Sequence, residues 1–272
     1  GLTLANVNGT VTVTAGTKTL NAAVSHAKAT ETTTLVSASA ETVNVTGTGN
    51  VAGTTAAGNL AAATAINTTG MTAGKATFAI DNGTVTTYTG GAGVDSVTVT
   101  NAATAITKAI DLGAGDDTLT LNGAAVAPTA TLKGGDGTDT IAMTGARAEA
   151  LSANATFAGK IEGFEKLSIT DKVAAAATVN MANMDGITYV VSNNASASAT
   201  VVGSKQSFSF DIAGLQIDSG ATLSAGGALL YTATADNTAA AAIIAAGLAT
   251  PVTINGVSYA VTTSGTVVTL TS

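Results

Sequence analysis

The sequence predicts an all-β fold: a parallel β-solenoid of the β-roll kind, followed by a small C-terminal β-rich piece carrying one short helix. Three observations lead to this prediction: a strand-forming composition, apolar residues that alternate with polar ones, and a Gly/Asp repeat that returns at equal intervals, at Asp95, Asp117 and Asp139. Because one coil of a β-solenoid takes about 20–25 residues, the interval of the repeat predicts coils that stack in register.

The composition favours repetition over a compact core. The 272 residues are 46% hydrophobic, but the chain has only five Phe, four Tyr and no Trp. With so few large side chains, stability has to come from many small contacts and long backbone ladders. The abundant Thr and Val favour strands, and 31 Gly supply turns.

Charge and cysteine content exclude several classes of protein. The net charge is −7, which argues against nucleic acid or an anionic membrane as a partner, because both need a basic surface. The longest apolar run, 239–246, is far too short to cross a membrane. The chain has no Cys, so disulfides and thiolate metal sites are excluded, and this suits a secreted protein.

Short strands are expected on both sides of the repeat, because apolar and β-branched residues alternate there between Gly and Asn. The segments are GTVTVTAG (9–16), AETVNVTGTGN (40–50) and KATFAIDNGTVTTYTG (75–90) before the repeat, and FEKLSIT (164–170), ATVNM (177–181) and GITYVV (186–191) after it.

The character of the sequence changes near residue 205. We therefore expect a solenoid over 1–205, with the repeat at 90–145, and a separate C-terminal piece over 206–272. In that piece, SFSFDIAGLQI (207–217) predicts a pair of strands. DNTAAAAIIAAG (236–247) predicts a helix, from its Asp N-cap, Ala-rich body and terminal Gly.

The last segment, 251–272, reads as two or three strands. Asn255-Gly256 is expected to form a tight hairpin turn between two of them, because Asn-Gly accepts the positive φ angles that such turns need.

The repeat consists of three segments with the pattern Gly-x-Gly-x-Asp-[Ser/Thr]-apolar-x-apolar. They are GGAGVDSVTV (90–99), LGAGDDTLTL (112–121) and GGDGTDTIAM (134–143). The two apolar residues after each Asp are two positions apart and so face one side of a strand. The shared residues are Gly91, Gly93 and Asp95, then Gly113, Gly115 and Asp117, then Gly135, Gly137 and Asp139.

Stacked coils bring the three aspartates into a column. Coils lie about 4.8 Å apart, and like charges about 5 Å apart destabilise each other. Residues 95–139 hold six Asp and only two Lys, so the column needs another positive charge. Ca²⁺ fits, because it binds carboxylate and carbonyl oxygens together. Tight turns alone would explain one copy of the motif, but three copies in register favour calcium.

The three-fold repeat resembles that of a known protein family. Gly-Gly-x-Gly-x-Asp-x-apolar-x is the pattern of RTX calcium β-rolls. The run of turns followed by Gly163, Phe164, Glu165 and Leu167 more specifically resembles the RTX-like surface-layer (S-layer) lattice proteins of Gram-negative bacteria, of the Caulobacter type. The resemblance covers residues 90–170, and the rest of the chain is similar in composition only.

The resemblance implies a set of calcium ligands. The aspartates of the three repeats would bridge ions in adjacent gaps, and carbonyls near the paired glycines would complete the shells. Asp116 and Asp136 lie in the same turns, either as extra ligands or as solvated charges, and Glu165 is a further candidate ligand. Standard β-rolls use about 18 residues per coil and bind calcium on both edges. Here the coils take 22 residues, and the segments between the repeats, NAATAITKA (101–109) and NGAAVAPTATL (122–132), lack the motif. We therefore expect calcium along one edge only, with an ordinary turn on the other.

The implied function is that of an S-layer subunit. It would be exported unfolded, by a type I system, and fold at the cell surface when it binds calcium. Its expected partners are further copies of itself, and outer-membrane lipopolysaccharide through a region that the sequence does not identify. The alternative is an RTX-type adhesin or a β-roll module of a larger secreted protein.

An enzyme is not expected. The only His is His26, beside Ser25, and a Ser-His dipeptide does not make a triad, because its members must meet in space. We expect His26 on the surface. The acidic pairs Asp116/Asp117 and Glu162/Glu165 could imitate a glycosidase pair, but aromatic residues are only 3% of the chain.

Overall fold

The chain divides into two compact units, Gly1–Val202 and Gly203–Ser272, in this computed structural model. In the first unit the structure describes all residues except 15, 82, 102–103, 173–177, 185 and 195–199. In the second unit it describes residues 207–211, 216–217, 222–225, 228–232, 238–239, 251–254, 257–264 and 267–271.

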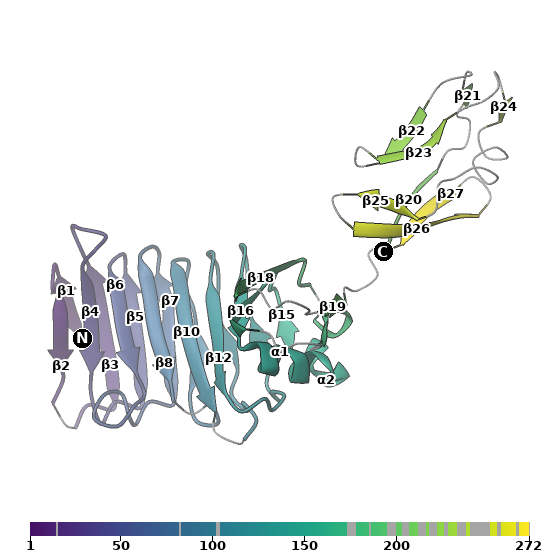
Figure 1. The fold of residues 1–272 in the computed structure, drawn as a ribbon. Helices are drawn as coiled ribbons and strands as arrows, with labels where there is room; N and C mark the ends of the chain where they lie inside the picture. The colour runs from purple at the N-terminus through teal and green to yellow at the C-terminus, as the bar shows by residue number, and fades with distance from the viewer. Residues whose placement is uncertain are drawn as a thin grey trace. The chain divides into compact units, whose positions relative to one another are not determined.

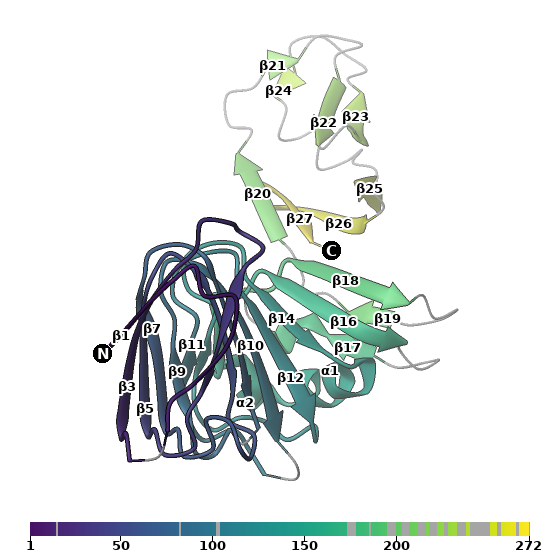
Figure 2. The ribbon, with the colours of Figure 1, turned by 90° about the vertical axis from the view of Figure 1, so that its left-hand side faces the viewer.

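The first unit is a parallel β-solenoid built from two sheets, which Figures 1 and 2 show as two walls with the core between them. The first sheet contains β1 (Leu2–Ala5), β3 (Thr19–Ser25), β5 (Thr42–Gly47), β7 (Ala65–Met71), β9 (Thr87–Thr89), β11 (Ile110–Asp111), β13 (Leu132–Lys133) and β15 (Ile161–Glu162). The second sheet contains β2 (Gly9–Thr12), β4 (Thr32–Val36), β6 (Asn50–Thr54), β8 (Lys75–Ile80), β10 (Val94–Asn101), β12 (Thr118–Gly123), β14 (Thr140–Met143), β16 (Lys166–Lys172) and β18 (Tyr189–Asn194).

The chain alternates between the two sheets, so each coil adds one strand to each of them. The repeat sets the register in the second sheet, where Val97 lies opposite Leu119 and Leu119 opposite Ile141. In the first sheet Ile110 pairs with both Tyr88 and Leu132. In both sheets the paired residues are separated by the interval of the repeat, which confirms the predicted parallel solenoid. The turns of the motif all connect a strand of the first sheet to the next strand of the second.

The core is a narrow layer of small and medium side chains between the sheets. Alternate residues of each strand point inward, so Val97, Val99, Leu119 and Leu121 are all buried, while the residues between them face outward. Phe78 and Tyr88 are the largest buried side chains and pack with their ring centroids 5.8 Å apart. Because each coil buries only a few side chains, neighbouring coils depend on one another.

Two helices interrupt the solenoid where the sequence predicted only strands. They are α1 (Gly145–Ser152) and α2 (Ala155–Ala158), between β14 and β15. Thr144 caps α1 by accepting a hydrogen bond from the Arg147 N–H, and Ala148 and Leu151 anchor the helix in the core. Near them lie β17 (Thr178–Asn180), the 3₁₀ helix η1 (Met181–Asn183) and β19 (Thr200–Val202).

No helix in the described part of the chain is long and apolar enough to cross a membrane.

The second unit pairs its strands antiparallel. The four-stranded sheet contains β20 (Ser207–Asp211), β27 (Val267–Thr271), β26 (Val257–Ser264) and β25 (Val252–Ile254). The remaining pairs are β21 (Gln216–Ile217) with β24 (Thr238–Ala239), and β22 (Thr222–Ala225) with β23 (Ala228–Thr232).

Two of the predictions for this unit need correction. The two strands of segment 207–217 do not pair with each other, because β20 pairs with β27 and β21 with β24. Most of the predicted helix at 236–247 lies outside the described residues, and the two residues that are described, Thr238–Ala239, form β24 instead. The expected hairpin places Ile254 opposite Val257, and the turn residues between them lie outside the described residues.

We predict that core and outward positions of one strand respond very differently to truncation. Leu119→Ala should lower the free energy of unfolding by about 2–5 kcal/mol, because it leaves a cavity between the sheets. Thr120→Ala, on the outer side of the same strand, should cost less than about 0.5 kcal/mol. Urea unfolding measures both, and equal losses would contradict the inward direction of Leu119.

Candidate cation-binding column

Four acidic side chains stack along one edge of the solenoid. Asp95, Asp117 and Asp139 occupy equivalent positions at the start of three successive strands of the second sheet, and Glu165 takes the same position in the next coil. We call these four residues the acidic column. The three aspartates are only 2%, 1% and 0% exposed, and Glu165 is partly exposed. The structure therefore brings together the aspartates of all three repeats, with Glu165 as a fourth member.

The column is linked by hydrogen bonds from backbone to carboxylate. The Asp95 N–H donates to Asp117 Oδ1 at 2.7 Å, and the Asp117 N–H donates to Asp139 Oδ1 at 2.8 Å. The Asp139 N–H donates to Glu165 Oε2 at 2.7 Å. The carboxylates of Asp117, Asp139 and Glu165 therefore reach back to the preceding coil, into the gap between the two coils.

These bonds satisfy only part of the column. Asp117 Oδ2 and Asp139 Oδ2 are buried and have no hydrogen-bond partner in the described part of the chain. Burial, together with the acidic neighbours Asp95 and Asp139, raises the pKa of Asp117 from 3.8 to about 7. Burial likewise raises the pKa of Asp95 to about 6, and the pKa of Asp139 is also raised, first by burial. In each case the surroundings disfavour the charged form.

Carbonyl oxygens lie close to the carboxylates because the turns are built from glycine. A Cβ on Gly113 would collide with the Gly91 carbonyl oxygen, and a Cβ on Gly137 would collide with that of Gly115. A Cβ on Gly134 would meet both the Gly163 carbonyl oxygen and Asp139 Oδ2. Gly113 and Gly137 also have φ angles of +96° and +136°, which other residues rarely adopt. The glycines thus let two kinds of oxygen converge between coils.

This set of oxygens suits a hard divalent cation. Ca²⁺ takes 6–8 oxygen ligands, and both carboxylates and backbone carbonyls serve. In the described part of the chain, no three His, Cys, Asp or Glu side chains are placed to hold a metal ion together. A cation would therefore have to draw most of its ligands from backbone carbonyls, with carboxylate oxygens such as Asp117 Oδ2 and Asp139 Oδ2 completing the shell.

The other acidic residues of these turns lie outside the column. Asp116 and Asp136 are exposed, and Asp116 Oδ1 accepts a hydrogen bond from the Thr138 N–H at 2.9 Å. Glu162 is exposed on the first sheet and lies 3.5 Å from Lys133 Nζ. The pairs Asp116/Asp117 and Glu162/Glu165 are thus split between an exposed and a more buried position, with only one member of each in the column.

The column has a defined beginning. Ala76 and Val51 occupy the positions equivalent to Asp95 in the two preceding coils, so the acidic residues start at Asp95. At that end the Tyr88 hydroxyl donates to Asp95 Oδ1 at 2.7 Å. The sequence did not single out Tyr88, although a Tyr at an inward position of an aromatic-poor chain was a signal that could have been followed.

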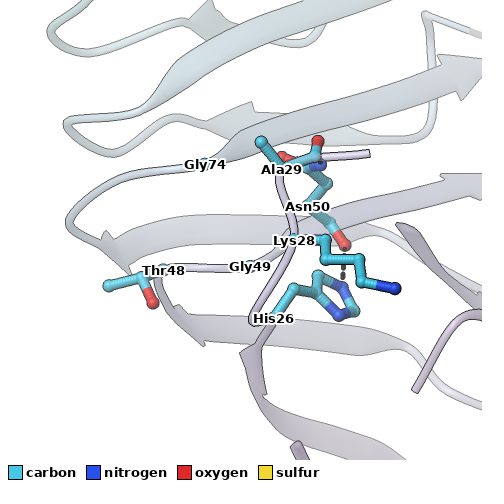
Figure 3. A pocket seen from close by; sticks show the side chains of 7 residues that line it. All are labelled: His26, Lys28, Ala29, Thr48, Gly49, Asn50 and Gly74. Carbon is cyan, nitrogen blue, oxygen red and sulfur yellow. Dashed lines mark hydrogen bonds between the residues drawn. The ribbon is translucent and has the colours of Figure 1, made fainter. Parts of the chain in front are cut away.

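The second feature of interest is His26, which lies at a cavity of about 220 Å³ (Figure 3). The prediction that His26 lies on the surface was wrong, because its side chain is only 2% exposed. His26 Nε2 lies 3.0 Å from the Asn50 carbonyl oxygen, and Nδ1 lies 3.9 Å from Glu31 Oε2. Asn50 also donates to the Ala29 carbonyl oxygen at 2.7 Å. His26 and Asn50 therefore help to hold the loop after β3 against the solenoid.

The chain matches no protein-family model, no curated protein and no solved structure in the comparisons made.

We predict that the protein without divalent cations loses stability as the pH rises. The pKa of Asp117 is higher in the folded chain than its ordinary value of 3.8. Its contribution to stability is therefore fully present below that value and is lost as the pH rises through about 7. Between pH 3.8 and about 7, urea unfolding in a chelator should show that the free energy of unfolding falls by at least about 1.4 kcal/mol, the equivalent of one pKa unit. Asp117→Asn should flatten this slope, whereas a stability that rises over this range would contradict the prediction.

Proposed function

We propose that the chain is a calcium-stabilised structural module of an extracellular surface layer. The observation that carries the proposal is the acidic column, with two buried carboxylate oxygens, on Asp117 and Asp139, that have no hydrogen-bond partner in the described part of the chain. A buried charge without a partner is strongly destabilising. Where these carboxylates are charged, positive charge in the gaps between these coils would therefore stabilise the fold.

Calcium ions would lie in successive gaps between coils, each held by one or two of the carboxylates of Asp117, Asp139 and Glu165 together with glycine carbonyls of the same turns. When bound, calcium supplies the positive charge that offsets the repulsion between stacked carboxylates. The chain presents carboxylate and carbonyl oxygens at the spacing of the coils. The glycines keep side chains out of the turns, so that these oxygens can approach one another.

Such a site couples cation binding to folding. The carboxylates come from successive coils, which are far apart along the chain, and they meet only when the coils stack. The unfolded chain has no comparable site, so the free energy of binding becomes free energy of folding. A chain of this kind would stay unfolded where calcium is scarce, as in the cytoplasm, and fold after export.

The role in a surface layer rests on the motif run, which resembles RTX-like S-layer proteins, and on the shape of the solenoid. Strands β2 and β18 end the nine-stranded sheet, and edge strands offer backbone groups for pairing with another chain. The proposed partners are further copies of this chain. An adhesin or a β-roll module of a larger secreted protein would share the calcium chemistry but would remain a monomer.

We predict that calcium stabilises the folded chain. The thermal melting temperature should rise with added Ca²⁺ and fall in a chelator, with loss of the β signal in circular dichroism, and Mg²⁺ should replace Ca²⁺ poorly because it demands a smaller octahedral shell. Asp136→Asn, in a turn but exposed, should behave like the wild type. A melting temperature that is the same in Ca²⁺ and in chelator would rule out the calcium site.

We also predict that calcium drives self-association. At about 10 mM Ca²⁺, above the weak affinities near 1 mM of extracellular modules, light scattering should show large oligomers, and electron microscopy should show ordered sheets. A chain that folds with calcium but remains monomeric would favour the adhesin or β-roll module over the lattice subunit.

A further inference from the structure

We infer that Tyr88 caps the acidic column, so that Asp95 is satisfied without a cation and the cation sites begin at Asp117. This inference rests on the proposed calcium function and goes beyond it, because it divides three aspartates with the same sequence motif into two kinds. It also differs from the expectation from the motif, in which all three bridge ions.

The three aspartates differ in their hydrogen bonds. Asp95 Oδ1 accepts from the Tyr88 hydroxyl at 2.7 Å, and Asp95 Oδ2 accepts from the Gly91 N–H at 3.2 Å. Both oxygens of this carboxylate therefore have a donor. Asp117 and Asp139 each have a donor on Oδ1 only, and their buried Oδ2 atoms have no partner in the described part of the chain.

Tyr88 lies beside Asp95, the first residue of the acidic column. It lies on β9, where it is buried, packs against Phe78, and places its hydroxyl 3.1 Å from Thr68 Oγ1. Burial raises its pKa well above the ordinary value of 10.0, and the neighbouring Asp95 adds to this rise, so the hydroxyl stays protonated and able to donate. The preceding coil offers Ala76, not a carboxylate, at the column position.

The consequence is a fixed boundary for cation binding. The carboxylates of Asp117, Asp139 and Glu165 reach into the gap before their own coils, whereas Asp95 accepts from Tyr88 and Gly91 of its own coil. At Asp95, the neutral hydroxyl of Tyr88 takes the place that positive charge takes at the carboxylates that follow. Asp117 and Asp139, whose buried Oδ2 atoms have no partner among the residues that the structure describes, are then the carboxylates that need a cation.

Calcium titration by calorimetry on the full chain tests this division. Asp117→Asn and Asp139→Asn should each lose at least one bound ion. Asp95→Asn should keep the wild-type number of ions, with the affinity changed less than about tenfold, because the amide oxygen of the new side chain would still accept from Tyr88. Asp136→Asn serves as the exposed control. If Asp95→Asn loses an ion as Asp117→Asn does, Asp95 is a ligand and the inference is wrong.

A second variant tests the cap itself. Tyr88→Phe removes one hydroxyl and leaves Asp95 Oδ1 without its donor, so this carboxylate becomes like that of Asp117. The variant should lose more stability in chelator than in calcium, and its melting temperature should rise more on adding Ca²⁺ than that of the wild type. Thr68→Val, which removes the neighbouring hydroxyl but leaves the bond from Tyr88 to Asp95 in place, should not enlarge the calcium response. An equal loss of stability for Tyr88→Phe in chelator and in calcium would overturn the cap.

These measurements distinguish a failure of the proposed calcium site from a failure of the Tyr88 cap. If the wild-type chain binds no calcium, the proposed function is wrong. If the wild type binds calcium and only the contrast between Asp95 and Asp117 is absent, the proposed function stands and the cap does not.

Discussion

The spacing of parallel strands is the constraint on which the rest of this structure depends. Stacking at about 4.8 Å turns any residue repeated at the interval of one coil into a column. For Val97, Leu119 and Ile141 this produces a continuous core, which is favourable. For Asp95, Asp117 and Asp139 the same stacking brings acidic groups together in a buried place, which is unfavourable unless each is compensated. The fold supplies a backbone N–H donor for one oxygen of each aspartate. The other oxygen of Asp95 accepts from Tyr88, whereas those of Asp117 and Asp139 have no partner in the described part of the chain.

The residues around the column follow from this constraint. Glycine is needed in the turns because carbonyl oxygens of adjacent coils occupy the space that a Cβ would fill. Tyr88 stands where the column meets a coil with Ala76 in place of an acid, and its hydroxyl completes the hydrogen bonds of Asp95. At the other end Glu165, which is longer than Asp, continues the column after the inserted helices α1 and α2 have lengthened the coil. The column thus has a neutral cap at one end and a partly exposed acid at the other.

The sequence predicted the parts of the fold that repeat, because a fixed period determines a register. The solenoid and the stacking of the three aspartates follow from spacing. Glu165 was a candidate because of the resemblance of its segment, since it follows Asp139 by 26 residues and so departs from the period of the repeat. Contacts that occur only once were missed. The helix at Gly145–Ser152 depends on burial of Ala148 and Leu151. The role of Tyr88 depends on its contact with Asp95, which joins the two sheets. The burial of His26 depends on the contact of the loop after β3 with Asn50. Such tertiary contacts leave no periodic signal in the chain.

Cation binding along the acidic column is tested most directly by a crystal structure of the chain grown in calcium, with an anomalous difference map to locate the ions. We expect peaks in the gaps between coils, within about 2.3–2.6 Å of Asp117 Oδ2 and Asp139 Oδ2 and of glycine carbonyl oxygens. We expect no peak between Asp95 and Ala76, next to the Tyr88 hydroxyl. A map without peaks along the column, from crystals that contain calcium and show the same stacked aspartates, would contradict cation binding there.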